Sequence, residues 1–210
     1  MSEKIKRNKK NKAWITEHVT DTYVQQAKAA GWRSRAAFKL MELDDDYQLL
    51  RPGMTVVDLG SAPGSWSQVA AKRIQPGGRL IALDILPMAP LSGVDFIQGD
   101  FREEAVLHQL EENLAGRQVD IVLSDMAPNL SGISMVDQAR VSLLAELALA
   151  FCANNLKPGG NLLIKAFQGS GFMDLRTAMA AMFQTVQVKK PSASRGRSPE
   201  SFLLARGKRG

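Results

Sequence analysis

Four charged residues in separate segments of the chain, Lys39, Asp125, Lys165 and Glu200, are of types that can do acid–base chemistry together. Three of the four fall where alternating strands and helices would bring side chains to one edge of a sheet. Two amines and two carboxylates beside a bound cofactor can remove the proton from a weakly acidic hydroxyl. The first hypothesis is therefore a site that deprotonates a hydroxyl next to a cofactor.

The elements that must position these residues follow from the apolar pattern. Strands alternating with helices predict one α/β domain with a mainly parallel sheet, right-handed crossovers, helices on both faces and a terminal hairpin. Gly31 is expected to interrupt the first helical segment. The predicted helical segments are 21–47, 66–74, 103–114, 138–156 and 173–183, and the predicted strands are 54–59, 79–84, 94–98, 119–124, 161–165, 185–189 and 201–205.

In such a sheet ligands bind beyond the carboxyl ends of the strands. The first strand leads into Asp58-Leu-Gly60-Ser-Ala-Pro-Gly64, whose glycines allow a tight turn and close approach of a ligand. Asp84 ends the second strand and suits ribose hydroxyls, and Asp100 follows the third, where it can accept from an adenine amino group with the Phe101 ring nearby. Three signals in this order predict a nucleoside site, although each carboxylate can also be a local turn residue.

The glycine turn also distinguishes between cofactors. A dinucleotide site has the pattern Gly-x-Gly-x-x-Gly, with the pyrophosphate on backbone amides. Here Asp58 precedes the first glycine, and the third glycine is absent. S-adenosylmethionine fits better, because it has no phosphate and its sulfonium and ammonium are attracted to carboxylates.

Asp125 and Lys165 end the fourth and fifth predicted strands. Asp125 is expected to face the methyl side of the cofactor, because the fourth strand should neighbour the first. Lys165 closes the apolar run 162–164, an unusual place for a cation unless it is functional, ion-paired or snorkelling.

At this point the chain resembles a known family, the bacterial FtsJ/RrmJ (RlmE) ribosomal RNA large-subunit methyltransferases. The resemblance extends from about residue 14 to 206 and includes 23–27, 33–39 and 83–87. Its most specific motifs are Val57-Asp-Leu-Gly-Ser-Ala-Pro-Gly-Ser-Trp66, Ser124-Asp-Met-Ala-Pro-Asn-Leu-Ser-Gly132 and Lys165-Ala-Phe-Gln-Gly169. Phe202 stands where the family often has tyrosine.

The resemblance implies a Rossmann-like, S-adenosylmethionine-dependent methyltransferase fold with a seven-stranded sheet. It also implies 2'-O-methylation of a uridine ribose in 23S rRNA, on the assembled large (50S) subunit. The family's catalytic set falls on Lys39, Asp125, Lys165 and Glu200, and its cofactor contacts fall on Gly64, Trp66, Asp84, Asp100 and Asp125.

The proton acceptor has two candidates. In the first, Lys165 is the general base, because burial and the nearby Lys39 favour its neutral form, and Asp125 orients it. Glu200 and Lys39 then hold the ribose or the second lysine. In the second, Asp125 is the base and Lys165 stabilises the developing alkoxide. Methyl transfer to oxygen needs no metal, and we expect none.

Net charge divides unevenly along the chain. Residues 1–12 have a net charge of +5 and residues 189–210 a net charge of +6, whereas 13–188 have −5. Basic ends of this kind attract polyanions. We expect a basic, disordered arm at 1–13 that either keeps the protein in solution or contacts RNA, and a single domain at 14–210. The expected RNA groove beside the site is lined by Lys28, Arg33, Arg35, Lys39, Arg195 and Arg197.

Several further expectations complete the hypothesis. No run of 18 apolar residues and no signal-peptide core is visible, which favours a cytoplasmic monomer without a membrane partner. The lone Cys152 is expected to be a buried structural thiol and Asp44–Asp46 to be solvated, while Trp32 either stacks on a base or packs on a helix. A tRNA methyltransferase, a non-catalytic ribosome-assembly factor and an NAD-dependent oxidoreductase remain as alternatives.

Overall fold

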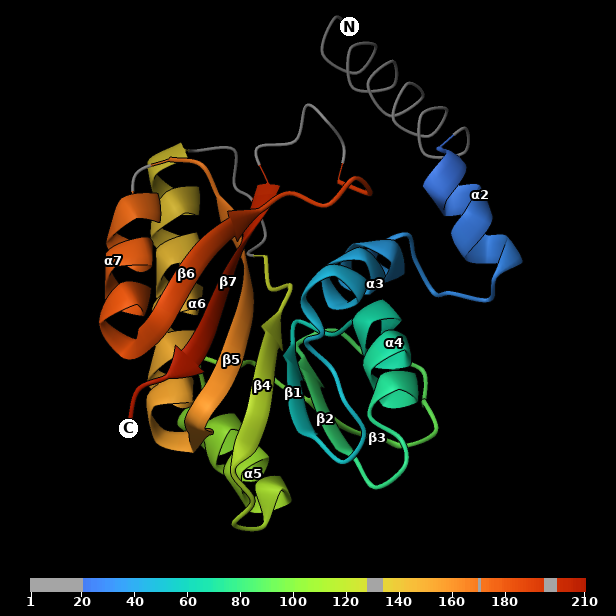
Figure 1. Ribbon diagram of the computed structural model, residues 1–210, viewed down its shortest axis with the longest axis horizontal. Coiled ribbons are helices and arrows are strands. Elements are labelled where there is room, and N and C mark those ends of the chain that lie inside the picture. The colour runs from blue at the N-terminus through green and yellow to red at the C-terminus, as the bar shows by residue number, and fades with distance from the viewer. Residues whose placement is uncertain (1–20, 128–133, 170, 195–199) are drawn as a thin grey trace, which may run out of the picture.

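The structure, a computed structural model, describes residues 21–127, 134–169, 171–194 and 200–210 (Figure 1). One sheet of seven strands runs through it. The helices are α2 (Thr22–Ala29), α3 (Ala36–Tyr47), α4 (Ser65–Arg73), α5 (Glu104–Leu114), α6 (Ser134–Asn155) and α7 (Phe172–Met182). The strands are β1 (Thr55–Leu59), β2 (Arg79–Asp84), β3 (Val94–Gln98), β4 (Val119–Ser124), β5 (Leu156–Phe167), β6 (Phe183–Lys189) and β7 (Glu200–Lys208).

The strand order is β3-β2-β1-β4-β5-β7-β6. Strands β3, β2, β1, β4 and β5 are parallel to one another, and β7 is antiparallel to both β5 and β6. The predicted parallel sheet, the neighbouring β1 and β4, and the terminal antiparallel pair are confirmed. The last strand enters between β5 and β6, which places the residues of β7 directly beside those of β5.

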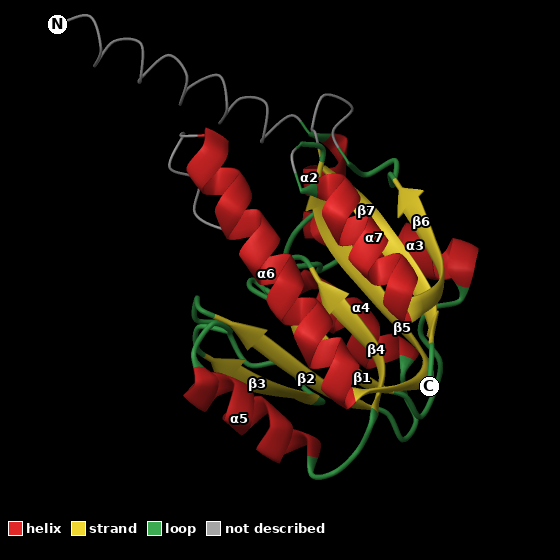
Figure 2. Ribbon diagram, turned by 90° about the vertical axis from the view of Figure 1, so that its left-hand side faces the viewer, coloured by secondary structure: helices red, strands yellow, loops and turns green. Residues whose placement is uncertain are grey.

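Helices cover both faces of the sheet (Figures 1 and 2). Along each strand alternate side chains point to opposite faces, so neighbouring residues such as Val56 and Val57 belong to different core clusters. On one face α3 and α4 pack against β1, β4, β5 and β7 through residues that include Leu40, Trp66, Leu123 and Phe202. On the other face α5, α6 and α7 pack through residues that include Leu110, Leu149, Cys152 and Met179. Cys152 is fully buried, as predicted.

The predicted break in the first helical segment is also confirmed. The Asp21 side chain accepts a hydrogen bond from the amide of Tyr23 and caps α2. The chain then turns at Gly31, whose φ of 74° is in the left-handed region. After this turn the linker 30–35 leads into α3, which carries Lys39.

Several predicted boundaries differ from the structure, and the largest difference is at the start of β5. A helix to residue 156 and a strand from 161 were expected, but β5 begins at Leu156, immediately after α6. Leu156 is 1% exposed and pairs with Val119 of β4, so burial of its side chain starts the strand early. Gly160 then packs against Leu156, where a Cβ would lie 2.8 Å from the leucine side chain. A Pro-Gly-Gly sequence that reads as a turn therefore becomes part of a strand.

Candidate active site

Lys165 and Asp125 form an ion pair at the carboxyl ends of β5 and β4. Lys165 Nζ lies 2.9 Å from Asp125 Oδ1 and donates a hydrogen bond of 2.6 Å to the Asp125 carbonyl oxygen. The lysine side chain is 8% exposed and the aspartate side chain 21%. The contact with Oδ1 does not have hydrogen-bond geometry, and this buried oxygen has no hydrogen-bond partner among the described residues. The pair therefore leaves an acceptor at the site.

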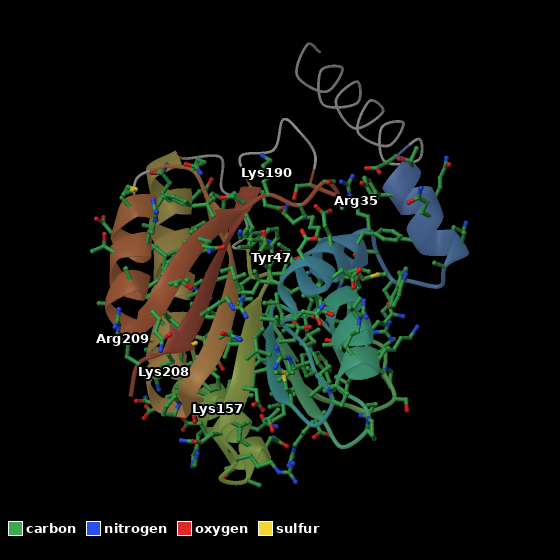
Figure 3. All side chains as sticks on the ribbon, in the orientation of Figure 1. Arg35, Tyr47, Lys157, Lys190, Lys208 and Arg209 are labelled. Atoms are coloured by element: carbon green, nitrogen blue, oxygen red, sulfur yellow. The ribbon has the colours of Figure 1, made fainter. Side chains whose placement is uncertain are left out.

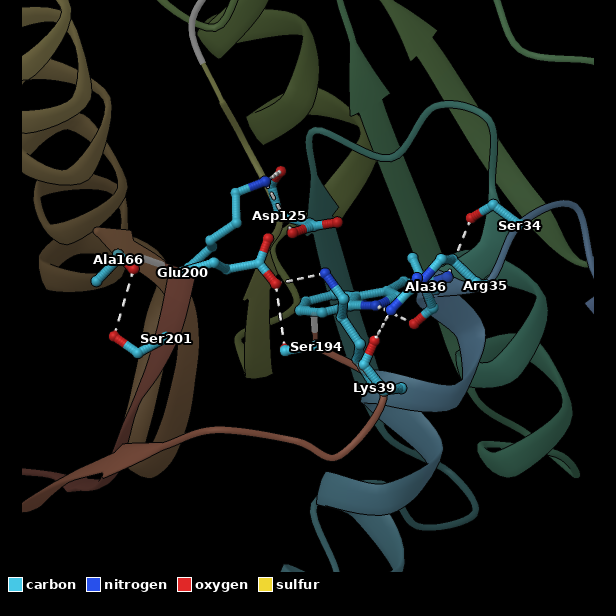
Figure 4. A network of polar contacts seen from close by, with 12 residues as sticks. Ser34, Arg35, Ala36, Lys39, Asp125, Ala166, Ser194, Glu200 and Ser201 are labelled. Carbon is cyan, nitrogen blue, oxygen red and sulfur yellow. Dashed lines mark hydrogen bonds and ion pairs between the residues drawn. The ribbon is translucent and has the colours of Figure 1, made fainter. Parts of the chain in front are cut away.

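Lys39 and Glu200 form the second ion pair. Lys39 Nζ on α3 lies 2.5 Å from Glu200 Oε1 at the start of β7, and the two side chains are 12% and 14% exposed. Figure 4 shows the Glu200 carboxylate between Lys39 and the loop residue Ser194, with Asp125 close by. The four residues predicted from the sequence therefore meet as two lysine–carboxylate pairs.

The pairing of β5 with β7 positions both halves of this site. In the register Lys165 lies opposite Phe202, and Phe167 lies opposite Glu200. Phe202 is fully buried, and the centroid of its ring is 5.5 Å from that of Trp66 and 5.6 Å from Lys39 Nζ. The apolar ring of Phe202 therefore packs beside the Lys39 ammonium group.

The segment before Glu200 is held on α3. The amide and hydroxyl of Ser192 donate to the Glu42 carboxylate, at 2.8 and 3.1 Å to Oε1. The hydroxyl of the buried Ser194 lies 3.3 Å from Glu200 Oε1. These contacts join residues up to 150 positions apart, and no sequence signal pointed to Glu42, Ser192 or Ser194.

The turn after β1 approaches the sheet closely. A Cβ at Gly60 would lie 2.7 Å from the backbone of Met126, and one at Gly64 would lie 2.6 Å from Arg33 Nη1. Both glycines have positive φ, 75° and 103°. The Asp84 carboxylate fixes this turn to the end of β2 by accepting from the amides of Ala62 and Leu86, each at 2.8 Å. Its oxygens keep further acceptor capacity toward a ligand.

Asp58 is in β1, just before this turn, and is fully buried. Its Oδ2 accepts from the Ser67 hydroxyl at 2.6 Å, and its Oδ1 has no hydrogen-bond partner within the described ranges. Burial, with smaller contributions from Asp125 and Asp84, raises the pKa of Asp58 to about 7. Besides this buried group, Asp84 and Asp125 place carboxylates at the ends of β2 and β4, a setting that disfavours a pyrophosphate and fits a cation such as the sulfonium of S-adenosylmethionine.

Two of the predicted cofactor contacts are constrained by their surroundings. The Trp66 side chain is 2% exposed, and its Nε1 donates to the Ala36 carbonyl at 2.9 Å. A contact from Trp66 would therefore come from its backbone, in the first turn of α4. Asp100 pairs with Arg102 at 2.5 Å, and these hydrogen bonds lower the pKa of the Asp100 carboxyl. Phe101 was expected beside an adenine, but its ring is buried in the core against Phe151.

Three of the six basic residues predicted to face RNA, Arg33, Arg35 and Lys39, have partners inside the protein. The Arg35 guanidinium contacts Asp21 and the Ala193 carbonyl, and Arg33 donates to two carbonyl oxygens, so an RNA contact would have to share these groups. Figure 3 shows Arg35 and Lys190 at the end of the sheet where the four charged residues meet, and Lys157, Lys208 and Arg209 at the opposite end. Lys28 is exposed on α2, and Arg195 and Arg197 lie outside the described residues.

The structure also shows how the side chains of Trp32 and Asp44 are packed. Trp32 packs against the core of α3 and α4, and Lys72 Nζ lies 4.4 Å from the centroid of its ring. The prediction that Asp44 is solvated is wrong: it is 4% exposed, accepts from the Leu50 amide at 2.7 Å and pairs with Arg73. Asp45 and Asp46 are exposed.

A cavity of about 240 Å³ lies between α6, α7 and the end of β5, where Ala166 and Phe167 of its lining directly follow Lys165. Its lining is mostly apolar, with Glu146 and Asp174, and it includes none of the four charged residues. Within the described residues no three His, Cys, Asp or Glu side chains are grouped to hold a metal ion. Of the helices in these ranges, none has the length and hydropathy to span a membrane.

Comparison with known proteins decides the family. The model of the FtsJ-like methyltransferase family matches residues 32–208. The chain belongs to the FtsJ-like methyltransferase family. The S-adenosylmethionine-dependent methyltransferase predicted from the sequence, with its cofactor and Rossmann-like fold, is thereby confirmed.

Similar proteins agree with this FtsJ-like assignment. The chain is 63% identical to the ribosomal RNA large subunit methyltransferase E of Azoarcus sp. (strain BH72), over 95% of this chain and 98% of that relative. It is 58% identical to the protein of the same name from Nitrosospira multiformis, over 98% and 100%. A solved structure from Plasmodium falciparum, assigned as a ribosomal RNA methyltransferase, has a TM-score of 0.75 and 33% identity, over 85% of this chain and all of that one.

A more distant structure shares the fold of this FtsJ-like protein. Fibrillarin from Aeropyrum pernix, solved with natively bound S-adenosyl-L-methionine, has a TM-score of 0.56 and 15% identity. The match covers 81% of this chain and 73% of fibrillarin. The common sheet therefore persists where little of the sequence is shared.

Proposed function

We propose that this protein transfers the methyl group of S-adenosylmethionine to the ribose 2'-oxygen of a uridine in 23S rRNA, within the large ribosomal subunit. The observation that carries the proposal is the meeting of Lys39, Asp125, Lys165 and Glu200 beside the glycine turn. Relatives named as large-subunit rRNA methyltransferases over nearly the whole chain support the substrate class.

In this proposal, alignment of the methyl group with the ribose 2'-oxygen supplies much of the rate enhancement. Methyl transfer to oxygen is an in-line displacement, and alignment of the reacting groups contributes up to roughly 7–11 kcal/mol. S-adenosylmethionine, when bound, supplies the methyl group on a positively charged sulfur. Gly64, the backbone of Trp66, Asp84, Asp100 and Asp125 are the groups that we expect to hold it.

The ribose hydroxyl must also lose a proton. In our proposal Lys165 accepts it, while the Asp125 carbonyl, at 2.6 Å, holds the amine in place. In the competing assignment the Asp125 carboxylate accepts the proton, and Lys165 stays charged and stabilises the alkoxide. Asp125 Oδ1, which lies 2.9 Å from Lys165 Nζ but accepts no hydrogen bond among the described residues, keeps this second assignment open.

The pairs suggest how the ribose is held. Lys39 and Glu200 present a donor and an acceptor 2.5 Å apart, both largely shielded from solvent. A 2'-hydroxyl both donates and accepts hydrogen bonds and marks the substrate as RNA. We therefore propose that this pair orients the ribose toward Lys165 and Asp125.

The test of the proposed function is methylation with labelled S-adenosylmethionine of separate pools of large subunits, free rRNA and tRNA. We expect label in the large subunit, on one ribose, found as a 2'-O-methyluridine by mass spectrometry of the digested RNA. Label in tRNA alone would overturn the substrate assignment. If the wild-type protein binds large subunits but labels no RNA, a non-catalytic assembly role replaces the enzymatic one.

The pH dependence of single-turnover methylation separates the two proton acceptors. A rate controlled by a group that titrates in the acid range, together with activity that survives in Lys165→Ala, contradicts the lysine-base assignment. Loss of activity in Lys165→Ala with retained cofactor binding is expected from both assignments, so the lysine-base assignment is supported only if the group that controls the rate does not titrate in the acid range.

A further inference from the structure

The linker before α3 is attached to the turn after β1 by three contacts. Arg33 Nη1 donates to the Pro63 carbonyl at 2.9 Å, the hydroxyls of Ser34 and Ser65 are 2.6 Å apart, and Trp66 Nε1 donates to Ala36. All three involve the segment 63–66, which contains Gly64. The turn is therefore held from outside by the segment that leads into Lys39.

Arg33 has a second function in this arrangement. Its Nη2 donates to the Pro90 carbonyl at 2.9 Å, in the loop between β2 and β3. One guanidinium thus bridges the turn after β1 and the loop after β2. Its own amide donates to Gln68 Oε1 on α4 at 2.8 Å, which fixes the backbone from which the side chain extends.

The bridge is closely packed against the turn. A Cβ at Gly64 would lie 2.6 Å from Arg33 Nη1 and 2.7 Å from Met88 Sδ. The space over Gly64 is therefore filled by Arg33 and by a residue of the β2–β3 loop. Without the guanidinium, neither the turn nor the loop keeps this support.

We propose that Arg33 is a positioning residue for the cofactor: it holds the turn at Gly64 and the loop at Pro90 at a fixed separation, so that S-adenosylmethionine enters a preformed site. The inference rests on S-adenosylmethionine as the cofactor of the proposed function. It differs from the RNA contact expected from the sequence, because both arms of the guanidinium already bind carbonyl oxygens.

The geometry requires arginine rather than any cation. A planar guanidinium presents donors in a fixed fork, whereas the lysine ammonium is a single point at the end of a flexible chain. A lysine at position 33 would keep the charge but would lose the two separate nitrogens, Nη1 and Nη2, from which Arg33 donates to the Pro63 and Pro90 carbonyl oxygens. The bridge, and not the charge, is therefore the property to test.

Calorimetry of S-adenosylmethionine and S-adenosylhomocysteine binding to the full-length protein tests the proposal without turnover. We expect Arg33→Ala to weaken both affinities by about tenfold to a hundredfold, because two charge-assisted hydrogen bonds are lost. Arg33→Lys should lose almost as much despite keeping the charge. Millimolar guanidinium should restore part of the affinity of Arg33→Ala. At saturating cofactor, kcat should stay within about threefold of wild type, so that the effect appears in KM.

The same binding measurements include a control variant and a result that would contradict the proposed role of Arg33. Arg51→Ala removes an exposed arginine and should bind both ligands as the wild-type protein does. Circular dichroism checks that each variant is folded. If Arg33→Ala is unfolded, the binding of Arg33→Lys tests the proposal instead. Unchanged cofactor affinity in a folded Arg33 variant, with or without weaker binding of large subunits, overturns the proposal. Failure of the wild-type protein itself to bind S-adenosylmethionine would instead overturn the proposed function, and the positioning role with it.

Discussion

Lys39 Nζ and Glu200 Oε1 lie 2.5 Å apart, although 161 positions separate the two residues in the chain. Both side chains are largely shielded from water, at 12% and 14% exposure. Removing one partner of such a pair leaves the other charge poorly solvated, so the pair acts as a unit. It joins α3 to the start of β7 across the site.

Each single substitution in this pair should therefore leave one shielded charge without its partner. The sum of the two single effects on the free energy of unfolding should then exceed the effect of the double substitution. We expect Lys39→Met and Glu200→Gln each to lower the free energy of unfolding by about 1–3 kcal/mol, with a coupling energy of about 0.5–3 kcal/mol in the double-mutant cycle. Urea unfolding measures both quantities. The exposed pair Arg73–Asp45, whose side chains are 42% and 61% exposed, is the control, with a coupling energy below about 1 kcal/mol. Additive effects at Lys39 and Glu200 would show that the two side chains do not act together.

Lys165 should be required for the methyl-transfer step rather than for cofactor binding. We expect Lys165→Ala to slow single-turnover methylation by about 10²–10⁴-fold, the range that general acid–base catalysis contributes. Binding of S-adenosylhomocysteine should change little. Lys157→Ala is a control on the same strand, because Lys157 pairs with Asp120 far from the site. Equal losses in the two variants would exclude a specific role for Lys165.

The buried Asp58 should make stability depend on pH. Its pKa is raised from 3.8 to about 7, so between these values the folded protein keeps a proton that the unfolded chain releases. The stability from this proton is complete below about pH 4 and is lost as the pH rises through 7. Asp58→Asn, which does not ionise, should therefore gain stability relative to wild type between pH 5 and pH 8, by roughly 3 kcal/mol.

Thermal unfolding of both proteins across this pH range measures the difference. Asp46→Asn, at an exposed carboxylate on α3, should show no comparable trend. A difference between Asp58→Asn and wild type that stays constant from pH 5 to pH 8 would contradict a pKa of about 7 for Asp58.

Gly60 is required for space as well as for backbone conformation. Gly60 and Gly31 have nearly the same φ, 75° and 74°, but a Cβ at Gly31 would meet nothing within 4 Å, whereas one at Gly60 would meet the Met126 backbone at 2.7 Å. Gly31→Ala should cost about 1–2 kcal/mol of stability. Gly60→Ala should cost more and should also weaken S-adenosylhomocysteine binding, because Met126 is next to Asp125. Similar melting temperatures and affinities for the two variants would refute the steric requirement.

Local sequence patterns predicted much of the fold. Alternating apolar runs and glycine turns predicted seven strands, their mainly parallel arrangement and the break at Gly31, because these features depend on neighbouring residues. The strand from Leu156 was missed because Pro158-Gly159-Gly160 has the composition of a turn. Only the burial of Leu156 against β4 shows that it belongs to a strand.

The sequence by itself determined the types of residue at the candidate site and the strand ends near which Asp84, Asp125 and Lys165 lie, because the carboxyl ends of parallel strands meet at one edge of the sheet. Tertiary structure alone decided which charges pair. Lys165 pairs with Asp125 because β4 and β5 are neighbours, and Lys39 pairs with Glu200 because β7 lies beside β5 and under α3. It also decided that Arg33 binds the cofactor turn and that Trp66 is buried, since such contacts depend on packing between segments that are distant in the chain.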